Sequence, residues 1–171
     1  MSKRIGKKLP EEGVRIHGFS RVMIKEDDKV VGDTGFMGPN LITNLGFTYY
    51  LCRLIAASAG SLQIAYVALG TGGLPATDAI TLPGEISGST QRRTVALAYT
   101  SRANSTSAET IQFAGSFYSS VAFLAGASNI SNIGLYNGTT TTNTLFAGNT
   151  YASSACNTNQ DVYVTYQIRF S

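Results

Sequence analysis

The last segment of the chain alternates apolar and polar side chains more regularly than any other. In "DVYVTYQIRF", residues 161–170, every second position is apolar or aromatic. These positions are Val162, Val164, Tyr166, Ile168 and Phe170, and the positions between them are Tyr163, Thr165, Gln167 and Arg169. A period of two is that of a β-strand with one face against a core, and it does not fit a helix. The chain must therefore build a sheet with a buried face.

Shorter patterns of the same kind fill much of the remaining chain. Residues 14–33 predict a β-hairpin, because Val14, Ile16, Val22 and Ile24 alternate before a turn at 26–28. After Ser61 the strand-like segments are "LQIAYVALG", "TQRRTVALAYTSR", "ETIQFAGSFYSSVAFLA", "NISNIGLYNG" and "NTLFAGNTY". The positions that we expect on buried faces are Val95, Leu97 and Tyr99 in the second segment, and Ile111, Phe113, Phe117, Val121 and Phe123 in the third.

One segment, residues 44–58, changes to a helical period. Its apolar residues recur at four-residue steps, at Phe47, Leu51, Ile55 and Ala59. Thr43 or Asn44 is a suitable N-cap and Gly60 a suitable C-cap. We therefore predict one α-helix here, with an apolar stripe that packs against a large surface.

Together these patterns predict a mainly β protein, an antiparallel β-sandwich or jelly-roll-like domain with one α-helix. A chain of 171 residues is of single-domain length. We assign residues 13–171 to this domain and residues 1–12 to a flexible basic arm. No run of about 18 apolar residues is present, so we expect no membrane partner.

Charge is scarce in this sequence and unevenly placed. Charged residues make up 13% of the chain, against roughly 25% in an average soluble domain. Residues 110–171 contain only Asp161 and Arg169. Such neutral, Ser/Thr/Asn-rich surfaces are typical of β-proteins that pack against copies of themselves, so we expect a homo-oligomer.

The arm carries basic residues at Lys3, Arg4, Lys7 and Lys8. A basic arm can bind an acidic protein surface or nucleic acid, and it can equally be a solvated terminus. The run is short and has no aromatic residue for base stacking. Nucleic acid is therefore not the expected partner, and the sequence leaves open whether the arm contacts protein or nucleic acid.

The glycine-rich segment "VALGTGGLPATD", residues 67–78, is the strongest candidate for a nucleotide site. A phosphate-binding loop needs a lysine and a helix that begins at the loop. Here Leu74-Pro75 follows the glycines, no lysine is near, and Pro75 stands where a dinucleotide motif needs its third glycine. We therefore interpret the segment as a turn at the end of a strand, with Thr77 and Asp78 shaping the return.

No other pattern predicts catalysis or a cofactor. His17 is the only histidine and has no clear partner, and Cys52 and Cys156 lie far apart, with a free thiol as the default and pairing left open. Asp78 and Glu85 are the only close carboxylates outside the arm and the hairpin turn, and we expect surface or backbone-capping roles for them. We predict no catalytic residues, no metal site, no cofactor and no enzymatic activity.

Tyrosines are unusually numerous, which leaves a carbohydrate-binding face as one alternative. They are Tyr49, Tyr50, Tyr66, Tyr99, Tyr118, Tyr136, Tyr151, Tyr163 and Tyr166. The interpretation that we favour places most of them at core edges and subunit contacts.

Several segments resemble virion proteins of tailed bacteriophages. They are "GPNLITNLGFTYYLCRLI", "IAYVALGTGGLPATDAITLPGE", "FAGSFYSS", "NISNIGLYNG", "TLFAGNTYASS" and "VYVTYQIRFS", so the resemblance covers roughly residues 13 to 171. These motifs are structural and carry no catalytic residue. The "NGTTTTN" loop between Leu135 and Leu145 is the main departure.

The resemblance implies a structural protein of the virion. We expect a capsid decoration (cement) protein, made in the cytoplasm of the host bacterium and bound as an oligomer, a trimer by expectation, to the lattice of the major capsid protein. The alternatives are a tail, neck, baseplate or fibre-attachment protein with a tail partner, and a carbohydrate-binding module for host recognition.

Overall fold

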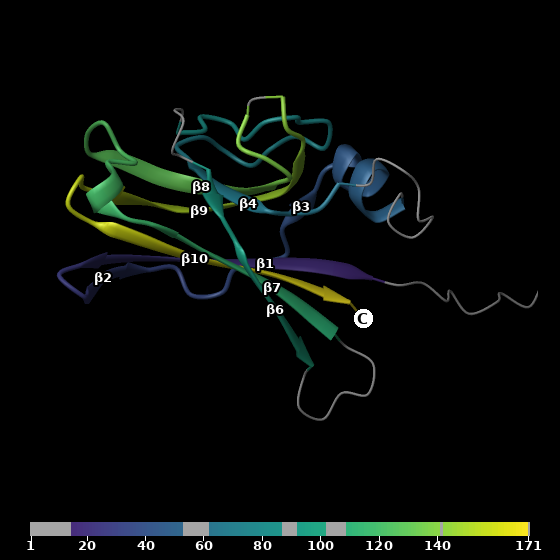
Figure 1. Ribbon diagram of the computed structural model, residues 1–171, viewed down its shortest axis with the longest axis horizontal. Helices are drawn as coiled ribbons and strands as arrows, with labels where there is room; N and C mark the ends of the chain where they lie inside the picture. The colour runs from purple at the N-terminus through teal and green to yellow at the C-terminus, as the bar shows by residue number, and fades with distance from the viewer. Residues whose placement is uncertain (1–14, 53–61, 87–91, 102–108, 141, 171) are drawn as a thin grey trace, which may run out of the picture.

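Two antiparallel five-stranded sheets form the computed structural model, which describes residues 15–52, 62–86, 92–101, 109–140 and 142–170 (Figure 1). The first sheet has the order β2 (Lys29–Asp33), β1 (Ile16–Glu26), β10 (Asp161–Phe170), β7 (Glu109–Phe117) and β6 (Ala96–Ser101). The second has the order β3 (Leu41–Ile42), β9 (Leu145–Cys156), β8 (Ser128–Tyr136), β4 (Tyr66–Gly70) and β5 (Arg93–Thr94). The prediction of a mainly β sandwich is confirmed.

The most regular sequence pattern forms the centre of the first sheet. Strand β10 pairs with β1 from Ile16 opposite Phe170 to Lys25 opposite Asp161, and with β7 on its other side. Its alternate residues Val162, Val164, Tyr166 and Ile168 are buried, as the pattern predicts. The hairpin is also confirmed, with Asp27 and Asp28 in the left-handed region at its turn.

The main core contains residues of both sheets, and Ala68, Leu82, Tyr136 and Leu145 form a smaller cluster separate from it. The largest fully buried side chains are Tyr136, Tyr166, Phe117, Phe123, Phe146, Leu69, Ile130, Ile133, Leu135, Leu145, Val22 and Val67. Two ring pairs join separate elements, since Phe117 packs on Phe123 and Tyr50 on Phe146, with centroids 5.5 and 5.0 Å apart. Burial of each of the large apolar side chains in this list stabilises the fold by about 1.5–3 kcal/mol.

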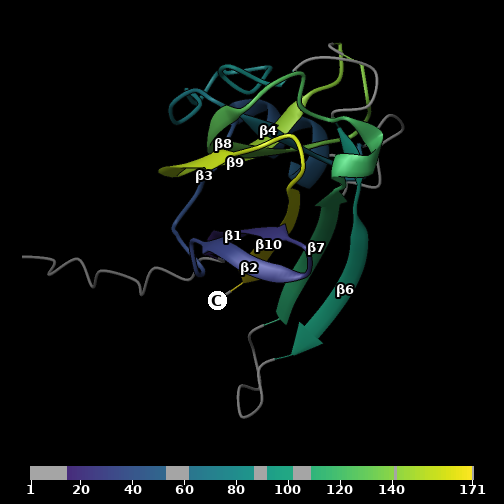
Figure 2. The same cartoon turned by 90° about the vertical axis from the view of Figure 1, so that its left-hand side faces the viewer.

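A single extended segment, residues 93–101, connects the sheets. Its first part, β5, pairs with β4 in the second sheet, and its last part, β6, pairs with β7 in the first. Val95 lies between the two parts, and its amide donates to the carbonyl of Ala65. Strand β6 therefore reaches the outer edge of the first sheet (Figure 2).

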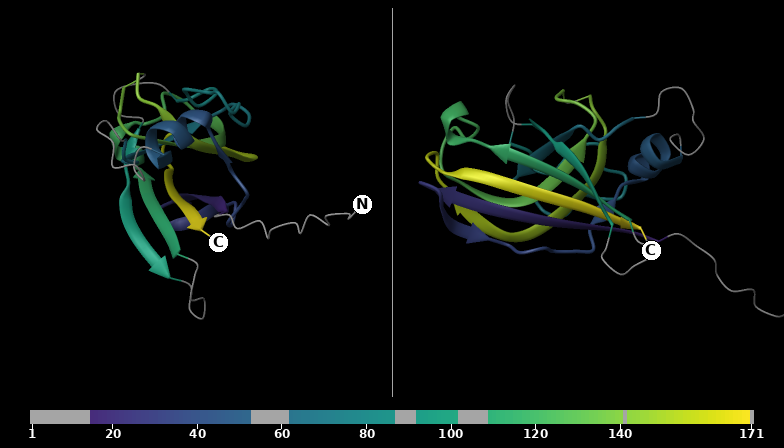
Figure 3. Two further views of the ribbon diagram at one scale, coloured as in Figure 1. Left: turned by 90° about the vertical axis from the view of Figure 1, so that its right-hand side faces the viewer. Right: turned by 60° about the horizontal axis from the view of Figure 1, so that its bottom comes forward.

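The helix is shorter than predicted within the described residues and presents a different face. It is a π-helix, η1 (Gly46–Cys52), and residues 53–58 of the predicted helix lie outside the described residues. Thr43 caps it as expected, because its Oγ1 accepts from the amide of Gly46 at 2.9 Å. Figure 3 shows η1 at the end of the molecule where β10 ends.

The predicted helical stripe is wrong at Phe47, which is 45% exposed, whereas Tyr50 is 3% exposed. The wider π-helical turn changes which residues face the core. Tyr50 is held there by its hydroxyl, which donates to the carbonyl oxygen of Thr144.

Two predictions about strand faces also need correction. Val121 is not a core position of a strand, because residues Ser119–Val121 form the short helix η2, and Val121 is 45% exposed. Leu97 does lie on the inward side of β6, opposite the buried Phe113, yet it is 50% exposed. Strand β6 extends past the cover that the second sheet provides (Figure 2).

Candidate functional site

The glycine-rich segment forms a turn that is held in place by hydrogen bonds from side chains of β8. Strand β4 ends at Gly70, and the chain returns to bridge Gly70 with Glu85. The side-chain amide of Asn132 donates to the carbonyls of Gly73 and Pro83, at 3.0 and 2.8 Å, and Ser131 donates to the carbonyl of Gly72. The groups engaged are thus carbonyl oxygens, whereas a phosphate cradle presents amide hydrogens.

The prediction that Thr77 and Asp78 shape the return of this turn is confirmed in part. Residues 77–78 form a turn, and the carbonyl of Thr77 accepts from the amide of Asn44 at 2.7 Å. Asp78 is exposed. Glu85 was expected at the surface or capping backbone, and that expectation is wrong.

Glu85 belongs to a partly buried ion pair with Arg92. The guanidinium donates to both carboxylate oxygens, at 2.6 and 3.0 Å, and also to the carbonyls of Gly138 and Thr140, at 3.0 and 2.6 Å. It lies 3.6 Å from the ring centroid of Tyr136, whose hydroxyl donates to Glu85. Burial raises the pKa of Tyr136, and the Glu85 carboxylate raises it further. Arg92 thereby joins the glycine-rich turn to the loop after β8.

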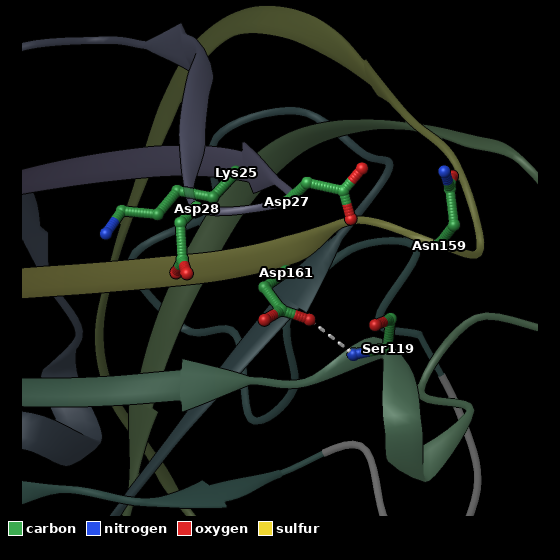
Figure 4. A pocket seen from close by; sticks show the side chains of 6 residues that line it. All are labelled: Lys25, Asp27, Asp28, Ser119, Asn159 and Asp161. Atoms are coloured by element: carbon green, nitrogen blue, oxygen red, sulfur yellow. Dashed lines mark hydrogen bonds between the residues drawn. The ribbon is translucent and has the colours of Figure 1, made fainter.

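A polar pocket lies at the end of the sandwich where the β1–β2 turn meets the start of β10 (Figure 4). We call it the end pocket. It has a volume of about 230 Å³ and is lined by Lys25, Asp27, Asp28, Ser119, Asn159 and Asp161. Asp161 accepts from the amide of Ser119 at 2.7 Å, which fixes η2 against β10 (Figure 4). Three carboxylates and one ammonium group line it, so the end pocket is acidic.

Two aromatic rings adjoin the end pocket. Tyr118 packs edge-to-face on Tyr163, with centroids 6.1 Å apart, and the ammonium group of Lys25 lies 4.7 Å from the Tyr163 centroid. The pKa of Tyr163 is raised, first by desolvation and then by the negative charges of Asp161 and Asp28. Tyr118 is 47% exposed. An exposed aromatic face beside carboxylate, amide and hydroxyl groups is the combination that can hold a sugar ring.

An apolar groove of about 360 Å³ lies at the opposite end of the first sheet. It is lined by Tyr50, Leu51, Leu62, Gln63, Ile64, Leu97, Ile111, Phe113, Phe146, Ile168 and Phe170, a set of described residues with no charged member. The groove lies between the inward face of β6, β7 and β10 on one side and Phe146, η1 and residues 62–64 on the other.

The structure places the remaining candidates apart from one another. The arm residues Lys3, Arg4, Lys7 and Lys8 lie outside the described residues, as does the side chain of Cys52. His17 lies in β1 opposite Arg169, and Cys156 is a free, buried thiol whose pKa burial raises to about 11. Four tyrosines, Tyr50, Tyr136, Tyr151 and Tyr166, are buried.

Two kinds of feature are absent from the described residues. They contain no group of three His, Cys, Asp or Glu side chains placed to hold a metal ion. No helix among them has the length and apolarity needed to cross a membrane.

Sequence reasoning missed the end pocket and the Arg92 network. The pocket residues come from three segments far apart in the sequence, at 25–28, 119 and 159–161, so no local pattern connects them. A weak signal for the network was present, since Glu85 and Arg92 carry opposite charges and stand seven positions apart. Comparison of the chain with protein-family models, with curated proteins and with solved structures gives no match.

Proposed function

We propose that the protein is a non-enzymatic structural protein of a tailed-bacteriophage virion, a capsid decoration protein that binds the lattice of the major capsid protein as a homo-oligomer. The observation that carries the proposal is a sandwich whose described surface is neutral and partly apolar. Large apolar side chains are about half exposed at Val30, Val31, Phe36, Phe47, Leu74, Ile80, Leu97, Tyr118 and Val121. Where such side chains gather into one patch, they mark sites of contact between proteins.

The positions of the resembling residues support a structural role. Thr43, in "NLITNLG", binds the carbonyls of Leu145 and Phe146 and caps η1. Glu85, at the end of "PATDAITLPGE", pairs with Arg92. These residues hold η1 and loops of the second sheet in place, as expected of a protein whose shape is its function.

Attachment in this proposal depends on the arm. A basic segment that precedes the sandwich can contact an acidic surface of the capsid, and weak contacts repeated over a lattice sum to strong binding. Most soluble homo-oligomers have closed symmetry, and we propose that this oligomer has it too.

Deletion of residues 1–12 tests this proposal. We expect the truncated protein to keep its circular dichroism spectrum and its unfolding temperature but to lose binding to undecorated particles in a co-sedimentation assay. Lys29→Ala, which removes a basic residue from the exposed strand β2, is the matched control and should bind normally. Unchanged binding of the truncated protein would contradict the role of the arm.

Immunogold labelling of intact particles tests the location. Label distributed over the head supports decoration. Label at the neck, tail or baseplate would replace the decoration proposal with the tail alternative, and absence of label from purified particles would refute a virion protein.

The end pocket favours a second candidate, a carbohydrate-binding host-recognition module. Tyr118 beside an acidic, amide-containing pocket is the observation that supports it. Tyr118→Ala should abolish binding to host cell-surface glycans on an array, whereas Phe36→Ala, at a similarly exposed aromatic elsewhere, should not. Equal binding by the two variants, or no binding by the wild-type protein, would exclude this candidate.

A further inference from the structure

The edges of the two sheets differ in how they are protected from pairing with other strands. An unpaired edge presents free amide and carbonyl groups, and natural proteins shield it with short strands, charges, prolines or bulges. The four edge strands of the described sheets are β2, β6, β3 and β5.

Three of these edges carry such protection. Strands β3 and β5 contain only two residues each. Strand β2 contains Lys29 and Asp33, and its pairing with β1 has a register shift between Ile24 and Lys25. The Asp33 carboxylate also binds Arg21 on the neighbouring strand, with 2.9 Å between Arg21 Nε and Asp33 Oδ1.

Strand β6 has none of these features. Its six residues, "ALAYTS", include no charged residue and no proline. It pairs with β7 in an unbroken register from Ala96 opposite Ala114 to Ser101 opposite Glu109. No described strand lies beyond it (Figure 2). A regular, uncharged strand of about 20 Å is therefore available for main-chain pairing.

The two faces of β6 suit a further strand at this edge. On the outward face, the exposed residues Ala96 and Ala98 are small and allow close approach. On the inward face, Leu97 borders the apolar groove and remains half exposed. A strand added beside β6 would cover Leu97 and extend the apolar layer.

We propose that β6 pairs antiparallel with β6 of a second copy about a two-fold axis, which joins the first sheets of two molecules into one continuous sheet. A second copy fits because two uncharged, identical strands meet without like-charge repulsion. A two-fold axis also brings the same patch of each copy to the interface. Leu97 of both copies therefore lies close to the axis. The inference rests on the self-associating role proposed above, and its unit is a dimer in place of the expected trimer.

The test compares edge variants of the full chain by analytical ultracentrifugation over a concentration series. Wild-type protein should sediment as a dimer. Ala98→Lys, which puts a charge on each strand near the axis, should raise the dimer dissociation constant at least about tenfold. Val31→Lys, at a residue of β2 that is 55% exposed, is the matched control at the other edge of the same sheet and should leave the dimer intact.

A cross-linking measurement keeps the proposal testable if Ala98→Lys misfolds. Ala98→Cys should form dimers with a short bismaleimide linker, beyond the background of the wild-type thiols, whereas Val31→Cys should not. A monomeric or trimeric wild-type protein, or a dimer that survives Ala98→Lys without cross-linking through Cys at position 98, would overturn the inference. If a monomeric Ala98→Lys protein still binds particles, the proposed function stands without this dimer interface. The two claims can therefore fail separately.

Discussion

At the scale of single residues, the glycine-rich turn shows how position decides whether a glycine is required. A Cβ on Gly72 would collide with the carbonyl oxygen of Pro83, whereas a Cβ on Gly73 would have no atom within 4 Å. The two adjacent glycines are therefore unequal. A ligand-binding loop would need both for backbone access to the ligand, whereas a packed turn needs only one.

Gly72→Ala should consequently destabilise the protein by about 1–3 kcal/mol, the usual cost of overpacking. Gly73→Ala should change the free energy of unfolding by less than about 0.5 kcal/mol. Urea denaturation of both variants measures the difference. Equal losses in the two variants would mean that the turn is not packed as described.

The Arg21–Asp33 pair predicts a small acid sensitivity. Hydrogen bonds from Arg21 and from the amide of Gly35 lower the pKa of Asp33 to about 2. Because the folded-state pKa lies below the unfolded value, the stabilisation is present above about pH 4 and is lost as the pH falls toward 2. The pair is exposed, so solvent screens it and its contribution to stability is small. Asp33→Asn should remove this pH dependence of the free energy of unfolding, whereas Arg21→Ala should reduce it and leave the part that the Gly35 amide contributes.

At the scale of elements, one arginine joins loops that the sheets alone leave separate. Arg92 binds Glu85 at the return of the glycine-rich turn and the carbonyls of Gly138 and Thr140 after β8. Its side chain is 3% exposed and that of Glu85 is 17% exposed. Removing one partner of such a pair leaves a poorly solvated charge.

Arg92→Met should destabilise the protein by about 3–5 kcal/mol, because the Glu85 carboxylate loses its partner. The double variant Arg92→Met with Glu85→Leu should recover part of this loss. Thermal and urea unfolding of the two variants would show it. A double variant as unstable as the single one would mean that the packing of Arg92 on Tyr136, and not the charge, is what matters.

Local patterns predicted the most regular strands, but they did not predict the contacts between elements or the exposure of Val121 and Leu97. The period-two pattern of β10 and the acidic turn at Asp27-Asp28 determine their own geometry, so both were predictable. The face of η1 depends on Tyr50 reaching Thr144, a residue 94 positions away. The Arg92 network and the end pocket likewise depend on how loops from distant strands meet, which no local spacing encodes.

At the scale of the whole molecule, the inward side of β10 supports both neighbouring strands. Val164, which is 2% exposed, lies opposite Val22 on one side and Gly115 on the other. Val164→Asp should abolish folding, because a carboxylate there would be buried without a partner. Thr165→Asp, one residue on and facing outward, should fold. Circular dichroism and size-exclusion chromatography distinguish the two outcomes, and a folded Val164→Asp protein would place the core on the wrong side of β10.

The pairing of β1 with β10 also has a mechanical consequence. Ile16 and Phe170 lie opposite each other at one end of an antiparallel ladder. Hydrogen bonds in such a ladder run perpendicular to the strands. A force applied through these two residues therefore breaks the hydrogen bonds one after another, starting at this end of the ladder. The same ladder pulled through Ile16 and Asp161, at its opposite ends, would instead resist by shearing, with all of its bonds sharing the load. A sandwich held through Ile16 and Phe170 would thus open at a lower force than one held through Ile16 and Asp161.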